Sequence, residues 1–182
     1  MRVITGTARG RKLRTLEGES VRPTTDKVKE AMFSIIQFDL PGTHVLDLFG
    51  GTGQLGIEAI SRGAKSAVFV DQSESACSLI RDNLKRTKFQ NSAKVVRSDY
   101  LTFLQNTKEK FDIILLDPPY AEIFLENSLK MISEIDILQT NGIIVTERPV
   151  EKALSWDFPG YSRSRDYKYG KTLLTIYRKE NP

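Results

Sequence analysis

Short apolar runs alternate with amphipathic segments along the chain from residue 44 onward. The runs are rich in Val, Ile and Leu, and they read HVLDLF, SAVFVD, AKVVRSD, FDIILLD and GIIVTER. Continuous apolar runs of this length are typical of buried strands in a parallel sheet, and the segments between them have helical periodicity. Strands that alternate with helices predict right-handed crossovers, with helices on both faces of the sheet.

The two ends of the chain depart from this pattern. Residues 1–15 predict two short strands around residues 6–10, and RPTTDKVKEAMFSII predicts a helix with Val28, Met32 and Ile35 on one face. The last segment, YSRSRDYKYGKTLLTIYR, contains no helical pattern and predicts an antiparallel hairpin that turns at residues 168–170.

The predicted fold is therefore α/β: a doubly wound, mostly parallel, seven-stranded Rossmann-like sheet that ends in an antiparallel hairpin. A short N-terminal β-hairpin and a helix precede it. At 182 residues the chain is expected to form a single domain, 1–182. Within it, residues 1–40 would be an extension on the substrate side, and residues 44–182 the core.

Composition argues against several kinds of site. Cys77 and His44 are the only residues of their types, so no internal disulfide, cysteine-based metal site or multi-histidine zinc site is expected. No apolar run approaches the roughly 20 residues that cross a bilayer. The N-terminal residues MRVITGTARGRKLRT lack the apolar centre of a secretory signal. We expect a cytoplasmic protein with no membrane partner and no metal.

Positive charge gathers near both ends of the chain, whose net charge is +4. Such clusters favour a polyanionic partner, because neutralising phosphates releases counterions. A solvated basic surface is an equal alternative on charge alone. The cations are Arg2, Arg9, Arg11, Lys12 and Arg14 at one end, and Arg163, Arg165, Lys168, Lys171, Arg178 and Lys179 at the other.

A glycine-rich segment, DLFGGTGQLG, follows the first parallel strand. Gly51, Gly53 and Gly56 match G-x-G-x-x-G between a strand and a helix. Glycines here allow a tight turn and bring backbone amides close to a ligand. The motif alone fits both dinucleotides and other cofactors that carry adenosine.

An aspartate lies at the carboxyl end of each of the first four parallel strands: Asp47, Asp71, Asp99 and Asp117. Each one taken alone could be a helix cap or a turn former. Four in succession favour a ligand site, because open α/β sheets bind ligands at this edge. Asp71 lies about 20 residues after the glycine loop, where a carboxylate can accept hydrogen bonds from ribose hydroxyls.

Two cofactors compete for this edge. NAD would bring a pyrophosphate against the glycine loop, where Asp47 disfavours a phosphate and suits a cation. S-adenosylmethionine has no phosphate and carries a sulfonium and an ammonium group. An NAD enzyme would also need a substrate domain, for which no residues remain, so the acid-lined edge favours S-adenosylmethionine.

The fourth strand ends in Asp-Pro-Pro-Tyr, residues 117–120. An exocyclic base amine is a poor nucleophile because its lone pair is delocalised into the ring. The Asp117 carboxylate and the Pro118 carbonyl could each accept one amine hydrogen and localise that lone pair. Pro118 and Pro119 would keep this geometry rigid, and Tyr120 would offer a flat face to an unstacked base. Asp117 would also stabilise the positive charge that develops on nitrogen.

These motifs resemble a known family. DLFGGTG and DPPY are similar to motifs I and IV of the class I S-adenosylmethionine-dependent amino-methyltransferases. GTARGRKL, RPTTDKVKEAMF and YGKTLLTIYR resemble the RsmD family of 16S ribosomal RNA guanine-N2 methyltransferases, over essentially the whole chain. DPPY is shared with adenine-N6 DNA methylases, whereas RPTTDKVKEAMF is more specific.

The resemblance implies methyl transfer to the N2 amine of a guanine in 16S rRNA, within a small-subunit assembly particle, by a monomer. Alternatives are a DNA adenine-N6 methyltransferase, a small NAD-binding oxidoreductase and a non-catalytic RNA-binding protein. The implied catalytic residues are Asp117, Pro118, Pro119 and Tyr120. The implied cofactor-binding residues are Asp47, Phe49, Gly50, Gly51, Gly53, Asp71, Gln72, Asp99 and Tyr100. The residues expected to bind RNA or border the base pocket are Arg9, Arg11, Lys12, Arg22, Pro23 and Thr24.

Overall fold

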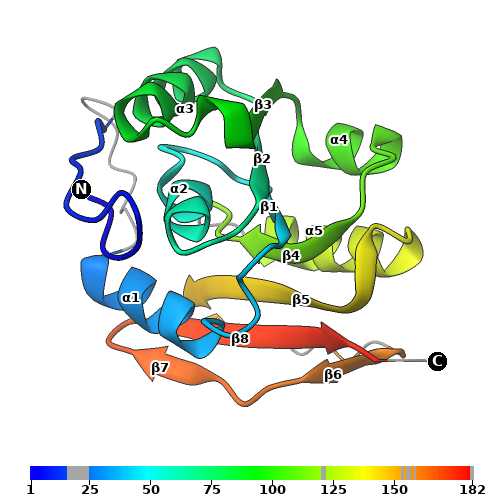
Figure 1. Ribbon diagram of the computed structural model, residues 1–182. Helices are drawn as coiled ribbons and strands as arrows, with labels where there is room; N and C mark the ends of the chain where they lie inside the picture. Colours follow the sequence, from blue (N-terminus) through cyan, green and yellow to red (C-terminus); the bar gives the residue numbers. More distant parts are fainter. Residues whose placement is uncertain (16–24, 120–121, 153, 155–156, 158, 181–182) are drawn as a thin grey trace.

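One mixed sheet organises the molecule in the computed structural model, which describes residues 1–15, 25–119, 122–152, 154, 157 and 159–180. The strand order is β3-β2-β1-β4-β5-β8-β6, and β7 also pairs with β8 (Figure 1). Strands β1 to β5 are parallel, whereas β8 runs antiparallel to β5. The strands are β1 (His44–Asp47), β2 (Ser66–Asp71), β3 (Ala93–Arg97), β4 (Phe111–Leu116), β5 (Leu138–Pro149), β6 (Tyr161–Arg163), β7 (Tyr167–Tyr169) and β8 (Thr172–Lys179).

Helices cover both faces of the sheet (Figure 1). Apolar side chains of α1, α2, α3 and the N-terminal segment share one core cluster with one face of the sheet. Helices α4 and α5 contribute to a second cluster on the opposite face. The helices are α1 (Asp26–Ile35), α2 (Gln54–Ser61), α3 (Glu74–Thr87), α4 (Tyr100–Asn106) and α5 (Glu122–Glu134), with a short 3₁₀ turn, Gln90–Ser92.

The predicted α/β fold class is confirmed, with a difference at the C-terminal edge. The sequence pattern predicted one hairpin there, whereas β6 and β7 are two short segments that both pair with β8. Ser164, whose amide donates to the Ile176 carbonyl and whose hydroxyl accepts from the Ile176 amide, lies in the break between them. The described part of the chain therefore has eight strands rather than seven.

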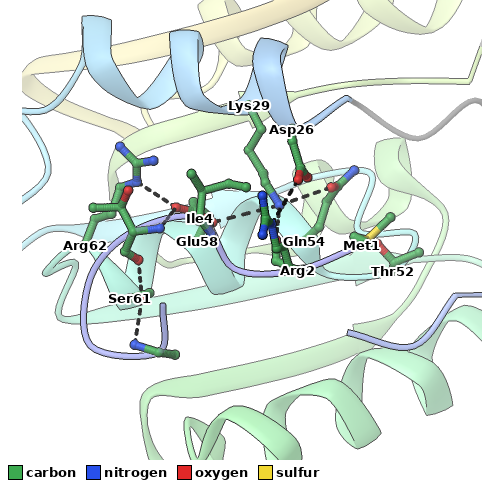
Figure 2. Close-up of polar contacts among 12 residues, drawn as sticks. Met1, Arg2, Ile4, Asp26, Lys29, Thr52, Gln54, Glu58, Ser61 and Arg62 are labelled. Atoms are coloured by element: carbon green, nitrogen blue, oxygen red, sulfur yellow. Dashed lines mark hydrogen bonds and ion pairs between the residues drawn. The ribbon is translucent and has the colours of Figure 1, made fainter. Parts of the chain in front are cut away.

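The N-terminal segment forms only a rudimentary hairpin. Arg2 and Lys12 make a single antiparallel bridge instead of two regular strands. The backbone between them bonds helix α2. The Glu58 carboxylate accepts from the Ile4 amide at 2.8 Å (Figure 2) and from the Thr5 amide at 3.0 Å. These hydrogen bonds replace the ladder that a longer hairpin would have made.

The described residues among the first 40 and the sheet contribute to the same core cluster. This shared core supports the expectation of a single domain, 1–182, which stays a prediction. In the part of the chain that is described, no helix has the length and apolar character needed to span a membrane.

Candidate active site

A cavity of about 860 Å³ lies at the carboxyl edge of the parallel strands. The four strand-end aspartates, Asp47, Asp71, Asp99 and Asp117, all line it. The topology brings them together because the carboxyl ends of parallel strands meet at one edge. The arrangement that the sequence pattern predicted is therefore present, although the four carboxylates differ in their surroundings.

The glycine loop between β1 and α2 forms one wall of the cavity. Gly50 and Gly51 line it, whereas Gly53 lies behind them as the N-cap of α2 with φ of 79°. A residue with a side chain would be strained in this left-handed conformation. Gly56 faces the ring of Phe69, where an added Cβ would come within 2.3 Å of a ring carbon. The loop glycines thus serve the turn and the packing of α2 on the sheet.

Asp47 is the most deeply buried carboxylate in the cavity wall, with 1% of its surface exposed. Its Oδ2 accepts a hydrogen bond of 3.0 Å from the Gly56 amide. Burial raises the pKa of Asp47 to about 7, and the charges of Asp117 and Asp71 add to this increase. A positively charged ligand group beside Asp47 would favour its ionised form.

Asp71 connects the second strand to the glycine loop. Its Oδ2 accepts from the Gly51 amide and its Oδ1 from the Ser73 amide, each at 2.9 Å. Both oxygens keep a further lone pair, so the carboxylate can still accept from a ligand. The neighbouring Gln72 is exposed and also lines the cavity.

Asp99 is a helix cap and a cavity residue at the same time. Its Oδ1 accepts from the amides of Leu101 and Thr102, at 3.0 and 3.2 Å, and thereby caps α4. The alternative interpretation of this aspartate as an N-cap is therefore correct for its local hydrogen bonds. It does not exclude a ligand contact, because Asp99 is exposed and lines the cavity.

Three aromatic rings form an apolar wall beside these carboxylates. Phe49 lies 5.2 Å from Tyr100 and 6.4 Å from Phe124, between ring centroids, and all three line the cavity. The sequence motifs predicted Phe49 and Tyr100 but not Phe124. The sequence does place Phe124 shortly after DPPY, in the first turn of α5, and this position is the signal that could have identified it.

The segment after β4 enters the same cavity. Asp117, Pro118 and Pro119 line it, and Asp117 is close enough to Asp47 for its charge to raise the pKa of Asp47. The expected amine-binding segment thus faces the same space as the glycine loop. Tyr120, the fourth residue of the motif, lies outside the described residues, so its predicted stacking role stays a prediction.

Three of the residues predicted to bind RNA are among those that the structure describes, and these three do not line the cavity. Arg9, Arg11 and Lys12 are exposed on the N-terminal segment, and Arg11 donates a hydrogen bond of 2.7 Å to the Arg86 carbonyl at the end of α3. The other three predicted residues, Arg22, Pro23 and Thr24, lie outside the described residues.

The side chains that line the cavity fit a ligand with hydroxyl and cationic groups. Carboxylates line its glycine-loop side, and an aromatic wall offers a flat apolar surface. Such a set matches the ribose, the ammonium and sulfonium groups and the adenine ring of S-adenosylmethionine. It is poorly matched to a pyrophosphate, which would lie against the buried Asp47.

Comparison with known proteins agrees with this fold. The family model described as conserved hypothetical protein 95 matches residues 1–178. The YlbH protein of Bacillus subtilis is 41% identical, covering 98% of this chain and 99% of that protein. Ribosomal RNA small subunit methyltransferase D of Escherichia coli is 31% identical, covering 99% of this chain and 90% of that protein.

Solved structures have the same fold. The structure of yhhF from Escherichia coli superimposes with a TM-score of 0.90 at 28% identity, covering 100% of this chain and 99% of that one. SMU.776, solved in complex with SAH, has a TM-score of 0.69 at 16% identity and covers 82% of this chain and 48% of that one, so it shows the fold alone. The chain belongs to the conserved hypothetical protein 95 family, the RsmD family of methyltransferases that its motifs resemble.

Proposed function

We propose that this protein transfers a methyl group from S-adenosylmethionine to the exocyclic N2 amine of a guanine in small-subunit (16S) rRNA. One observation carries the proposal: Asp117, Pro118 and Pro119 line the same cavity as the glycine loop and Asp47. An amine acceptor and a site suited to a cationic cofactor therefore face one space. The names of relatives such as ribosomal RNA small subunit methyltransferase D support RNA as the substrate.

The cofactor fits residues on the glycine-loop side of the cavity. Asp71 would hold the ribose hydroxyls, Asp47 would face the cationic groups, and Asp99 with the ring of Tyr100 would border the adenine. When bound, S-adenosylmethionine supplies an activated methyl group on its sulfonium. The backbone of Gly50 and Gly51 would form the floor beneath it, since both residues line the cavity.

Asp117 would act on the amine in two ways. Its carboxylate accepts one amine hydrogen while the Pro118 carbonyl accepts the other. These two hydrogen bonds localise the lone pair on nitrogen and reduce its delocalisation into the ring. The same carboxylate stabilises the positive charge that forms on nitrogen as the new bond develops. Two consecutive prolines limit the motion of this segment, so the acceptors are oriented before the base arrives.

RNA would be held outside the cavity by the exposed cations of the N-terminal segment, Arg9, Arg11 and Lys12. Phosphate contacts of this kind position a nucleic acid without reading its bases. We further propose that the partner is 16S rRNA in a small-subunit assembly particle, that the enzyme acts as a monomer, and that it does so in the cytoplasm.

The first test is tritium transfer from labelled S-adenosylmethionine, followed by nucleoside analysis. Substrates are small ribosomal subunits that lack guanine-N2 methylation, with adenine-containing duplex DNA in parallel. Label recovered as N2-methylguanosine is expected. Label recovered as N6-methyladenine in the DNA would overturn the substrate and keep the chemistry, and tight NADH binding without any transfer would revive the oxidoreductase alternative.

Asp117→Ala tests the mechanism in the same assay. We expect methyl transfer to fall by about 100-fold or more, because a preorganised group that stabilises transition-state charge is removed. Binding of S-adenosylhomocysteine, measured by calorimetry, should change little. Asp82→Ala, which removes a carboxylate that pairs with Arg14 at the surface, is the matched control and should keep full activity. Full activity of Asp117→Ala would exclude this mechanism.

A further inference from the structure

The cavity has a second wall, which includes residues of the RPTTDKVKEAMF and YGKTLLTIYR segments. This wall is formed by the end of β5, the turn between β7 and β8, and the start of α1. It contains Glu147 on β5, together with Lys27, Lys152 and Lys171. A base amine held by Asp117 would bring the rest of the base against this wall, so its side chains decide which base fits.

The register of the sheet, continued one residue past its last pair, Leu116 and Thr146, brings Glu147 beside Asp117. Strands β4 and β5 are parallel with Leu115 opposite Val145, and continuing by two residues brings Asp117 opposite Glu147. Leu115 and Val145 pack in the same core cluster, and side chains alternate along a strand, so the two carboxylates lie on one side of the sheet. Both line the cavity, and Glu147 is fixed further by pairing with Leu174 of β8.

Two adjacent carboxylates are complementary to two adjacent hydrogen-bond donors. On guanine, the N2 amine is followed by N1–H, which is a second donor. On adenine and cytosine, the amine is followed by a ring nitrogen with a lone pair, which a carboxylate repels. Enzymes that act on an unstacked base read this edge by hydrogen bonds.

We propose that Glu147 accepts the N1–H of the target guanine while Asp117 holds its N2 amine, so that Glu147 selects guanine over the other amino bases. This inference rests on the proposed function. The guanine O6 follows N1 along the edge of the base and needs a donor, and Lys27, Lys152 and Lys171 supply donors in the same wall. Glu147 is thus a specificity-determining residue rather than part of the cofactor site.

The test compares two RNA substrates in wild type and Glu147→Gln. The target guanine is first mapped with the wild-type enzyme, and an RNA fragment is then made with guanine or 2-aminopurine at that position. 2-Aminopurine keeps the N2 amine but has a lone pair at N1 and lacks O6. Single-turnover rates of methyl transfer are measured for both RNAs.

We expect wild type to prefer guanine by about 100-fold or more. A site that accepts a hydrogen bond from the guanine N1–H rejects 2-aminopurine, which lacks this donor. Glu147→Gln should reduce this preference to roughly 10-fold or less, because its carboxamide can donate to the N1 lone pair while the absence of O6 affects both enzymes equally. Where the variant is too slow for rates, the ratio of the two RNA dissociation constants gives the same comparison.

Glu151→Gln is the matched control, since Glu151 is an exposed carboxylate in the turn after β5 that also lines the cavity. It should keep the wild-type preference, and both variants should bind S-adenosylhomocysteine as wild type does. A wild-type preference in Glu147→Gln, whatever its absolute activity, would overturn the inference. A wild-type enzyme that methylates no guanine would instead overturn the proposed function.

Discussion

Asp47 illustrates how burial gives a strand-end carboxylate its chemistry. It lies in the cavity wall with 1% exposure, it accepts a hydrogen bond from the Gly56 amide, and burial raises its pKa to about 7. The folded protein therefore holds a proton on Asp47 at pH values at which the unfolded chain has released it. Stability must fall as pH rises across this window, since the folded state binds more protons.

Asp47→Asn tests this linkage in the cofactor-free protein. Between about pH 5 and pH 8 the wild type should lose roughly 2–3 kcal/mol of unfolding free energy from this group, at about 1.4 kcal/mol per pKa unit. The asparagine variant keeps an acceptor for the Gly56 amide and does not titrate, so it should lose correspondingly less. Urea unfolding at several pH values measures both, and parallel pH profiles would contradict the assignment.

At the residue scale, the sequence pattern identified the carboxylates at the ends of the first four parallel strands. Asp47, Asp71, Asp99 and Asp117 could be found because each terminates an apolar run, and the fold then brings those ends together. Glu147 was missed, although it ends the fifth run in the same way. The sequence pattern gives no register between strands. Only the register, which pairs Leu116 with Thr146 and points to Asp117 and Glu147 as the next pair, brings Glu147 into consideration.

Phe124 was missed for a different reason. An aromatic residue in the first turn of a helix is compatible with an ordinary core position, so its type alone indicates no ligand. The rings of Phe124, Phe49 and Tyr100 become a cavity wall only through the packing of α4 and α5 on one face of the sheet.

At the element scale, helix α2 connects the glycine loop to the N-terminal segment. Glu58 is fully buried and accepts hydrogen bonds from the amides of Ile4 and Thr5 and from the Arg62 guanidinium. The Lys29 ammonium of α1, also buried, lies 3.9 Å from the same carboxylate (Figure 2). One carboxylate thus joins α1, α2 and the N-terminal segment.

Glu58→Gln should destabilise this junction strongly. The carboxamide offers one acceptor atom to several donors and removes the buried counter-charge of the Lys29 ammonium, which costs about 3–5 kcal/mol. Chemical denaturation measures the destabilisation, and hydrogen exchange at the Ile4 and Thr5 amides should rise before exchange in β1. Glu74→Gln is the control, because Glu74 pairs with Arg97 at the surface and such pairs contribute at most about 1 kcal/mol.

The same junction shows what element-level patterns can and cannot predict. The alternation of strands and helices predicted the core fold, and the helix at α1 was found from its apolar face, with Val28, Met32 and Ile35. The N-terminal hairpin is less regular than the two strands that were predicted. The pattern of residues 1–15 does not show that some of their amides bond to Glu58 and Ser61. Hydrogen bonds to side chains that are distant in sequence therefore determine the conformation of this backbone.

At the scale of the whole molecule, the exposed cations of the N-terminal segment lie apart from the cavity lining. Arg9, Arg11 and Lys12 project from the N-terminal segment, and Arg11 reaches the end of α3, where Lys85 and Arg86 are also exposed. Anchoring by Glu58 holds this segment against α2, so its cations have a fixed place relative to the cavity. A surface of this kind suits the backbone of an RNA whose target base enters the cavity.

Arg11→Ala combined with Lys12→Ala tests whether this surface binds RNA. We expect weaker binding of small-subunit rRNA fragments and a salt dependence that flattens by about one unit for each phosphate that the variant no longer neutralises, since fewer counterions are released. Fluorescence anisotropy across a series of salt concentrations gives the slope. Lys94→Ala with Lys110→Ala removes the same charge from residues paired with Glu109 and Asp136, and should leave the slope unchanged. If both double variants keep the wild-type slope, the N-terminal cations are only a solvated surface, and the RNA must bind elsewhere on the molecule.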